Sequence, residues 1–345
     1  MTTRRAVVVA SEDGTTEVKE VPLPKLRDDY IIVRTKAVAL NPTDWKSLAG
    51  GATPGAISGC DYAGIVEQVG KAVPDLQPGD RVAGFARGAD SQNHDNGSFA
   101  TVITAKSGIY AKLTSDISFE DAATLGVGIS TVGQGLYQTL GLPLPPNKVS
   151  KPTSILIYGG STATGTLAVQ FAKLSGLTVY ATASPHNFDL VKSLGADEVF
   201  NYKDADVGAK IRAASNDSLA YVWDTISEGP SPGISAAALS SKGGQYATIL
   251  PVKNFPRDDV KPAFTLAYTS LGEEFHGLGG VWKASKEDYD YGVKFWKVAQ
   301  ELINQGKIRT HPTEVRSGGL EAIPQGLQDL KDGKVSGKKL VYKIE

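Results

Sequence analysis

The sequence predicts an α/β protein with two parts: a β-rich part, and a doubly wound parallel sheet inserted into it. Three observations lead to this prediction. Short apolar strands separated by Pro and Gly occupy residues 1–120, strands alternate with helices over residues 155–250, and the chain then returns to a helix and two strands. At roughly 150 residues per domain, a chain of 345 residues also favours two domains.

The first part consists of short strands that end at Pro and Gly. Apolar or alternating residues predict strands at 6–9, 30–39, 63–69 and 81–84, and residues 98–111 add one or two more. This pattern is typical of a twisted, mostly antiparallel sheet or a partial barrel. A helix is expected after Ser118, because its hydroxyl can cap the helix ahead of two acidic residues.

The pattern changes after a Pro-rich linker at residues 141–152. From there, strands alternate with helices at the spacing of a parallel, doubly wound sheet. Gly176 ends the first helix, and Ser184 caps the second, with Pro185 in its first turn. Strands are expected at 155–158, 178–183, 198–202, 220–224 and 245–250, and helices at 167–174, 185–195 and 207–214.

The last part contains an amphipathic helix at residues 289–304, in which apolar residues recur at helical spacing. Two strands, at 311–316 and 339–344, are expected to rejoin the N-terminal sheet. The β-rich domain is therefore expected to comprise residues 1–125 and 300–345, and the inserted domain residues 126–299.

The composition argues against several classes of function. The 36 Lys and Arg residues nearly balance 37 Asp and Glu, so neither nucleic acid nor an anionic membrane is expected as the main partner. One Cys and four His argue against a disulfide framework and against zinc sites that need several Cys. No apolar run is long enough to span a membrane, and the N-terminal apolar run is too short for a signal peptide. A cytoplasmic location is expected.

A glycine-rich loop follows the strand at 155–158 and opens the next helix, which is where a dinucleotide pyrophosphate would bind. The loop departs from G-x-G-x-x-G, so an ordinary tight turn is the alternative. Its position between a strand and a helix favours the dinucleotide site. The residues expected to bind the cofactor are Gly159, Gly160, Ser161, Thr162, Ala163, Thr164 and Gly165.

The end of the second strand of this sheet favours NADPH over NADH. An NAD enzyme places Asp or Glu here to bind the ribose 2′-OH. In this chain, the first carboxylate after the end of the strand at 178–183 is Asp189. Ser184 could also serve only as a helix cap. Tyr202, after the third strand, either lies against the adenine or phosphate or packs at the edge of the core. Four side chains can donate to a 2′-phosphate: Ser184, His186, Asn187 and Lys192.

Six further motifs stand in order along almost the whole chain: NPTDWK at 41–46, GCDYAG at 59–64, QPGDRV at 77–82, GSFA at 97–100, LGVGIST at 125–131 and SLGAD at 193–197. Together they resemble medium-chain dehydrogenases/reductases of the quinone-oxidoreductase type. The sequences around 158–164 and 184–190 resemble, more particularly, ToxD-like oxidoreductases and the trans-acting enoyl reductases of polyketide synthases. The resemblance implies a GroES-like catalytic domain and an inserted Rossmann domain that binds NADPH.

The resemblance also implies chemistry without a metal. Zinc-dependent relatives carry a Cys where Asn41 stands and Gly-His-Glu at 59–61, so the first ligand and the His are absent here. Their structural zinc lobe would fall at 83–96, which contains no Cys. Without a Lewis acid, the expected reaction is reduction of a polarised C=C bond. Hydride would pass to the β-carbon of an enoyl thioester or enone, and a proton to the α-carbon.

The resemblance places the first motif near the nicotinamide, so Lys46 is the main candidate for binding the carbonyl or donating the proton. Thr131 is expected to begin the helix that leads into the nucleotide domain. Asn41 could bind substrate or ribose, Tyr62 could donate to substrate, and Asp44 could orient Lys46. Each residue has a structural alternative: a solvated cation for Lys46, a helix cap for Thr131, a turn for Asn41 and Asp44, and core packing for Tyr62.

Three functions therefore stay open. The first is a metal-free, NADPH-dependent enoyl or enone reductase that acts on an α,β-unsaturated substrate, which is either a small molecule or bound to a carrier. If the substrate is carrier-bound, a polyketide synthase acyl carrier is the expected partner. The second is a free-standing reductase of small quinones or aldehydes. The third is a non-catalytic NADPH-binding protein, against which Lys46 and Thr131 argue. The family contains both monomers and homodimers.

Overall fold

The computed structural model describes residues 2–114, 116–277 and 279–345. The chain divides into two compact units, one of residues 1–130 and 268–345, the other of residues 131–267. The second boundary differs from the expected one at 299/300. The reason is that α8 (Lys286–Asn304) packs on β7 (Tyr110–Lys112), and the Asn304 amide donates to the Lys112 carbonyl at 2.9 Å. Residues 268–299 thus belong to the first unit.

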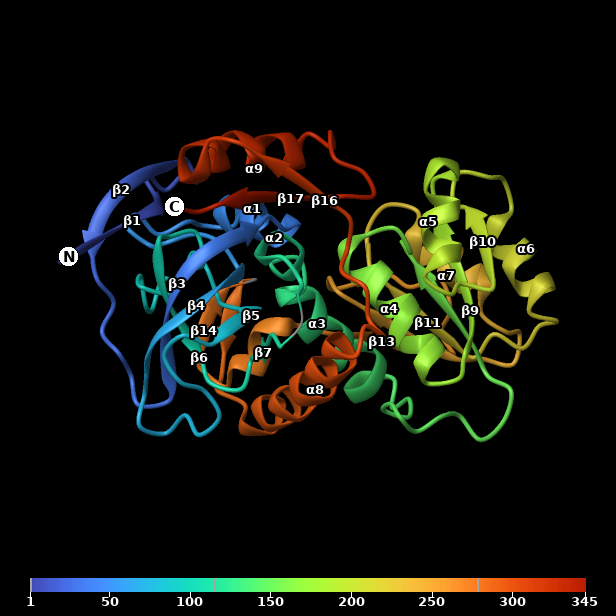
Figure 1. Cartoon of the computed structure of the whole chain (residues 1–345). Coiled ribbons are helices and arrows are strands. Elements are labelled where there is room, and N and C mark those ends of the chain that lie inside the picture. The colour runs from blue at the N-terminus through green and yellow to red at the C-terminus, as the bar shows by residue number, and fades with distance from the viewer. Residues whose placement is uncertain (1, 115, 278) are drawn as a thin grey trace. The chain divides into compact units, whose positions relative to one another are not determined.

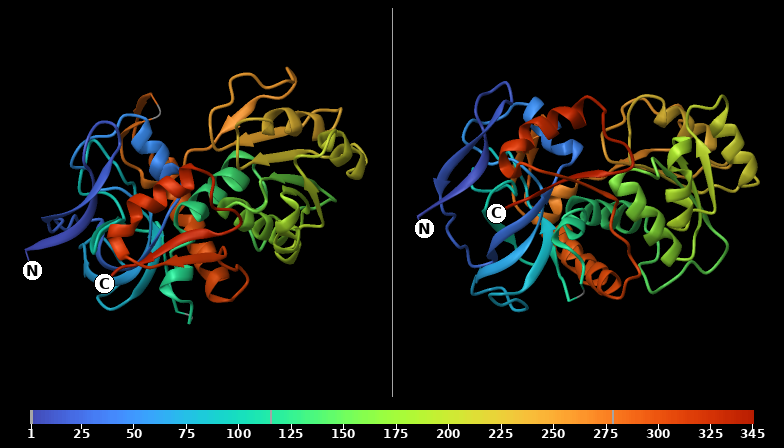
Figure 2. Two further views of the ribbon diagram at one scale, coloured as in Figure 1. Left: turned by 90° about the horizontal axis from the view of Figure 1, so that it is seen from above. Right: turned by 45° about the horizontal axis from the view of Figure 1, so that its top comes forward.

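The first unit contains a seven-stranded sheet with the order β16-β17-β3-β4-β5-β7, and β6 also pairs with β3. The C-terminal strand β17 is antiparallel to β3, which confirms that the chain end rejoins the N-terminal sheet. Both views of Figure 2 show this red strand in the same unit as the blue N-terminal segments. The strands are β3 (Tyr30–Ala39), β4 (Asp61–Val69), β5 (Arg81–Phe85), β6 (Val102–Lys106), β7 (Tyr110–Lys112), β16 (Thr313–Arg316) and β17 (Lys339–Lys343).

Some elements of this unit were not predicted. Strand β2 (Thr16–Pro22) pairs with β1 (Thr3–Val9), but its residues are mostly polar and exposed, so the hydrophobic pattern missed it. Helices α1 (Pro42–Ala49) and α9 (Ile323–Lys331) were also missed, as were η4 (Gly319–Ala322) and the hairpin of β14 (Phe275–Gly277) and β15 (Gly280–Trp282). Helix α2 (Phe119–Ala122) is confirmed, because the Ser118 hydroxyl accepts the Asp121 N–H at 3.1 Å.

The second unit is a six-stranded parallel sheet with the order β10-β9-β8-β11-β12-β13. The order reverses between β8 and β11, as in Rossmann folds. The strands run from green to orange in Figure 1. They are β8 (Ser154–Tyr158), β9 (Thr178–Ala183), β10 (Glu198–Asn201), β11 (Tyr221–Asp224), β12 (Gln245–Thr248) and β13 (Pro262–Phe264).

The helices of the second unit alternate with its strands as predicted, although the helix between β11 and β12 was not among the expected ones. They are α4 (Ala163–Leu174), α5 (Phe188–Ser193), α6 (Val207–Ala214) and α7 (Ser231–Ala238), with the short η2 (Pro185–Asn187) before α5. Helix α3 (Gly126–Val132), most of which belongs to the first unit, continues without a break into the π-helical η1 (Gly133–Thr139). After β13 comes η3 (Ala267–Leu271), which also lies mostly in the first unit. Among the described residues, no helix is both long and apolar enough to cross a membrane.

Candidate functional site

The glycine-rich loop adopts a backbone that requires its glycines. Gly159, directly after β8, has φ of +80°, a conformation that L side chains rarely adopt. A Cβ on Gly165 would lie 2.1 Å from the Gly159 carbonyl oxygen, and a Cβ on Gly160 would lie 2.9 Å from Ala181 Cβ. The three glycines therefore let the loop turn tightly and let α4 start close to the sheet.

Threonine side chains hold this loop. The Gly159 N–H donates to Thr182 Oγ1 at 2.9 Å, and Thr225 donates to the Tyr158 carbonyl at 2.7 Å. Thr162 caps α4 by accepting the Gly165 N–H at 2.8 Å. The first N–H groups of any helix lack intrahelical acceptors, so the start of α4 offers donors to an anion. This cradle fits the pyrophosphate of a dinucleotide. Ser161 lies in the loop, and Ala163 and Thr164 are the first residues of α4.

The residues proposed for the 2′-phosphate are only partly grouped. Ser184 precedes η2 but makes no side-chain cap, and its hydroxyl lies 3.5 Å from the Tyr202 hydroxyl. Ser184 thus occupies the predicted N-cap position, but its side chain makes no cap hydrogen bond and its hydroxyl is directed to Tyr202. Lys203, which was not among the predicted residues, has its Nζ 5.8 Å from the Tyr202 ring centroid. Lys203 directly follows Tyr202 in the chain, and this position is the sequence feature that could have indicated a second donor for the 2′-phosphate.

The remaining three residues of that prediction lie in η2 and α5. His186 is exposed in η2, and Asn187 is buried at the end of η2. Lys192 is exposed on the last turn of α5, at the opposite end of the helix from Ser184. Ser184 and Lys203 both contact Tyr202, so these three residues form one local group of donors.

In the first unit, α1 carries most of the predicted catalytic residues. Asn41 caps the helix and Pro42 occupies its first turn, a combination typical of helix starts. The Asn41 N–H donates to Asp44 Oδ2 at 2.7 Å, so Asp44 closes the cap and is not shown to orient Lys46. Lys46 is half-buried, with Nζ 5.6 Å from the Trp45 ring centroid.

Asp44 belongs to a buried polar cluster with Cys60, Asp61 and Tyr268, which was not predicted from the sequence. Burial raises the pKa of the Asp44 carboxyl to about 7, and the nearby Asp61 carboxylate acts in the same direction. Burial also raises the pKa of the Cys60 thiol well above its usual value, which fits a structural Cys and not a nucleophile. The Tyr268 hydroxyl lies 2.6 Å from Thr43 Oγ1 and 3.8 Å from Cys60 Sγ, so it joins η3 to α1.

Asp61 and Lys339 form a buried ion pair next to this cluster. Lys339 Nζ donates to Asp61 Oδ2 at 2.5 Å, and both side chains are almost completely buried. The other carboxylate oxygen accepts the Val127 N–H at 2.6 Å, and Lys339 also donates to the Thr124 carbonyl at 3.3 Å. The pair thus fixes the start of α3. Burial lowers the pKa of His311 to about 3, with the positive charge of Lys339 as a further cause.

Two predicted catalytic residues lie in other surroundings than expected. Thr131 does not begin a helix, because α3 starts at Gly126 and runs on into η1; a capping role is therefore excluded. Thr131 stands at the first residue of the second unit. Tyr62 is fully buried in an apolar cluster with Ile31 and Ile103, and its hydroxyl has no partner among the described residues. This is the core packing that the sequence left open as the alternative.

The segment that corresponds to the zinc lobe of relatives is held by polar contacts. The Arg87 guanidinium donates to Asp90 at 2.7 Å and to the His276 carbonyl at 2.6 Å, and Asn96 donates to Asp90 at 2.9 Å. In the three described segments of the chain, no three His, Cys, Asp or Glu residues are grouped so that they could hold a metal ion.

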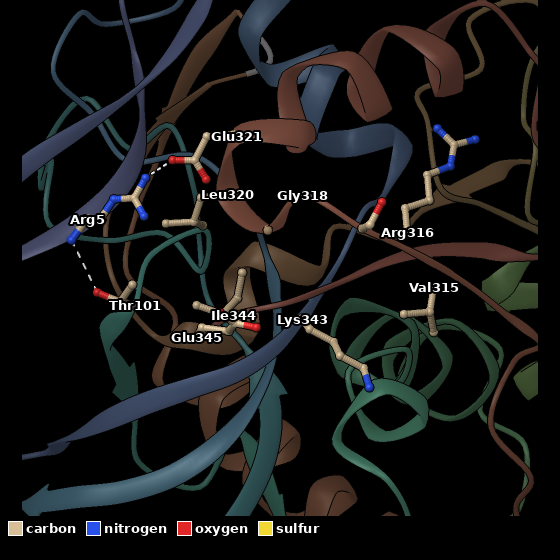
Figure 3. A pocket seen from close by; sticks show the side chains of 12 residues that line it. Arg5, Thr101, Val315, Arg316, Gly318, Leu320, Glu321, Lys343, Ile344 and Glu345 are labelled. Atoms are coloured by element: carbon tan, nitrogen blue, oxygen red, sulfur yellow. Dashed lines mark hydrogen bonds and ion pairs between the residues drawn. The ribbon is translucent and has the colours of Figure 1, made fainter.

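A separate pocket of about 510 Å³ lies in the first unit, at the C-terminal end of β16 and β17 (Figure 3). None of the predicted site residues line it. Its cations have partners: Arg5 pairs with Glu321, Arg316 with Asp329, and Lys343 with Glu120 outside the pocket. Because these charges are compensated, the pocket offers no distinct anion site.

The comparisons with known proteins agree with this architecture. The alcohol dehydrogenase GroES-like domain matches residues 27–115, and the zinc-binding dehydrogenase domain matches residues 163–249. The solved structure of the CurK enoyl reductase covers 99% of this chain and 99% of its own, with a TM-score of 0.78 at 20% identity, which shows a shared fold. The fold and the phosphate loop define an oxidoreductase of the medium-chain dehydrogenase/reductase type that uses a nicotinamide cofactor.

Two relatives define the family more closely. Trans-enoyl reductase ACTTS2 of Alternaria alternata is 62% identical over 100% of both chains. The enoyl reductase component lovC of the lovastatin nonaketide synthase of Aspergillus terreus is 38% identical, over 99% of this chain and 96% of that protein. The chain belongs to the trans-enoyl reductase family of the medium-chain dehydrogenases/reductases.

Proposed function

We propose that this protein reduces the C=C bond of an enoyl thioester carried by a polyketide synthase acyl carrier, with NADPH as the cofactor. The observation that carries the proposal is the end-to-end relationship to trans-enoyl reductases, together with the phosphate cradle and the capped helix α1. The relative named as a component of the lovastatin nonaketide synthase supports a synthase partner.

NADPH, when bound, supplies a hydride for the β-carbon of the substrate. The chain's own residues have three tasks. The loop from Gly159 to Gly165 binds the pyrophosphate, and Ser184, Tyr202 and Lys203 bind the 2′-phosphate. Lys46 stabilises the negative charge that develops on the thioester oxygen, or donates the proton that the α-carbon takes up.

We expect the purified protein to oxidise NADPH with an enoyl-pantetheine thioester at least tenfold faster than with small quinones or aldehydes, because a carrier-bound substrate contributes binding energy through its long arm. Lys46→Met should lower kcat about 100-fold, the usual contribution of a general acid. Absorbance of reduced nicotinamide measures both. Lys297→Met is the matched control, since Lys297 is an exposed helical lysine of the same unit. Faster turnover of quinones or aldehydes would overturn the proposal, as would full activity of Lys46→Met.

We expect Lys203→Ala to weaken NADPH binding about tenfold and to leave NADH binding unchanged, because an ammonium near the 2′-phosphate contributes only to the phosphorylated cofactor. Fluorescence titration of both dinucleotides measures this difference. Lys192→Ala is the control, because Lys192 lies at the far end of α5. Equal loss of affinity for both dinucleotides, or equal affinity of the wild type for both, would contradict the proposed cofactor preference.

A further inference from the structure

Two buried polar atoms in the cap of α1 have no hydrogen-bond partner among the described residues. They are Asn41 Nδ2, which is a donor, and Asp44 Oδ1, although the Asp44 carboxyl also interacts with the Cys60 thiol. Asn41 is only 4% exposed and Asp44 only 3%. Folded proteins rarely leave such atoms unpaired, so two of them in a single helix cap indicate a place where a ligand completes the hydrogen bonding.

The cap holds these two groups in a fixed arrangement. Asp44 Oδ2 accepts the Asn41 N–H at 2.7 Å, and the Asp44 N–H donates to the Asn41 carbonyl at 3.0 Å. Most of the other unpaired buried atoms are hydroxyls of Ser and Thr, which can rotate toward a neighbouring carbonyl. An amide group cannot adapt in this way, so Asn41 Nδ2 needs an acceptor from elsewhere.

The surroundings of the cap decide which acceptor fits. Asp61 faces Asp44 from β4, but its charge is paired with Lys339 of β17. Cys60 precedes β4 and Tyr268 lies on η3; both are neutral, because burial raises their pKa values. A second carboxylate or a phosphate would face the acidic Asp44 and Asp61. A neutral carbonyl oxygen accepts from the amide without that repulsion.

We propose that the cap of α1 is the subsite for the thioester carbonyl of the acyl substrate, with Asn41 Nδ2 as the donor to its oxygen and Asp44 as the positioning residue that holds Asn41. This inference rests on the proposed function, since it names the part of an enoyl substrate that the cap binds. Negative charge grows on this oxygen as the β-carbon is reduced, so the hydrogen bond strengthens in the transition state. The substitution of Asn41 should therefore affect kcat more than KM.

The first test replaces the donor. Asn41→Asp keeps the shape of the side chain and removes the N–H donor, and Asn41→Ala removes the whole amide. Both should lower kcat for an enoyl-pantetheine about 100-fold, as expected for loss of one oxyanion donor, with NADPH affinity within about twofold of wild type. Asn304→Ala is the control, because the Asn304 amide is fully partnered by Thr114 and Lys112 in the same unit. Unchanged kcat, or a loss that appears in NADPH affinity, overturns the subsite.

The second test separates positioning from a purely structural role. Asp44→Asn keeps an oxygen that can accept the Asn41 N–H, so it should retain kcat within about threefold, whereas Asp44→Ala should lose about tenfold. In the wild type, kcat should fall as pH rises through about 7, because ionised Asp44 opposes charge on the substrate oxygen. Asp44→Asn should abolish that fall. An identical pH profile in Asp44→Asn, or equal kcat in both variants, overturns the positioning role.

A binding measurement keeps this inference distinct from the proposed function. Calorimetric titration with a saturated acyl-pantetheine thioester needs no turnover, and Asn41→Asp should bind it about tenfold more weakly than wild type. Equal binding by both overturns the subsite. If the wild type binds this thioester but reduces no enoyl thioester, the proposed function is wrong and the subsite stands; if it does neither, both are wrong.

Discussion

Replacing Lys339 by Met should destabilise the first unit by about 3–5 kcal/mol, because the Asp61 carboxylate would stay buried without its counter-charge. Among the described residues, Asp61 would keep the Val127 N–H as its donor, and the Thr124 carbonyl would lose the ammonium. Urea denaturation followed by tryptophan fluorescence measures the change. In a unit of this size it corresponds to a fall in Tm of roughly 10 °C.

Two further variants make this result specific to burial. Lys343 lies in the same strand as Lys339 and forms an ion pair with Glu120, but its side chain is 64% exposed. The loss of unfolding free energy in Lys343→Met should therefore stay below about 1 kcal/mol. The double variant Asp61→Asn, Lys339→Met removes both charges and should recover part of the lost stability. If Lys339→Met is as stable as Lys343→Met, the ion pair does not hold the start of α3 as described.

The second large effect concerns pH, because Asp44 and His311 should give the free energy of unfolding opposite slopes. Asp44 has a pKa of about 7 in the folded state and 3.8 as its ordinary value, so between these values the folded state binds more protons and stability falls as pH rises. His311 has a folded pKa of about 3 and an ordinary value of 6.5, so stability there rises with pH. Each slope is about 1.4 kcal/mol per pH unit.

Single substitutions should reveal the two slopes. Relative to wild type, Asp44→Asn should become progressively more stable between about pH 4 and 7, by about 4 kcal/mol in all, because it avoids a buried carboxylate. His311→Gln should show the opposite trend and gain as pH falls below about 6.5. Denaturant titrations at several pH values measure both. Parallel stability curves for wild type and either variant would rule out the corresponding titration.

The sequence predicted much of the parallel sheet, since buried parallel strands are continuous apolar runs that alternate with segments of helical spacing. The strand at Thr178–Ala183 and the helix at Val207–Ala214 have the predicted bounds. Elements with a weaker local signal escaped: β2 is half polar, and α1 is short and was treated as a turn. Helix α8 was found by its periodicity, but only its contact with β7 assigns it to the first unit.

Part of the candidate site could likewise be predicted from local sequence motifs, and part could not. The glycine spacing pointed to the phosphate loop, and the structure adds Thr182 and Thr225, which come from other strand ends and have no local motif. Asn41 was found through a motif. Asp44 appeared only as a neighbour of Lys46, because a linear sequence does not show which carboxylate is buried beside another.

The sequence by itself determined the two-part organisation, the phosphate loop and the family, because these depend on local periodicity, on glycines with special backbone conformations and on motifs in order. Only the tertiary structure decided that Tyr62 packs in the core, that Thr131 lies inside a continuous helix, and that Asp61 pairs with Lys339. The physical reason is that burial and charge pairing are set by residues distant in the chain. Lys339 is brought to Asp61 because β17 and β4 both pair with β3.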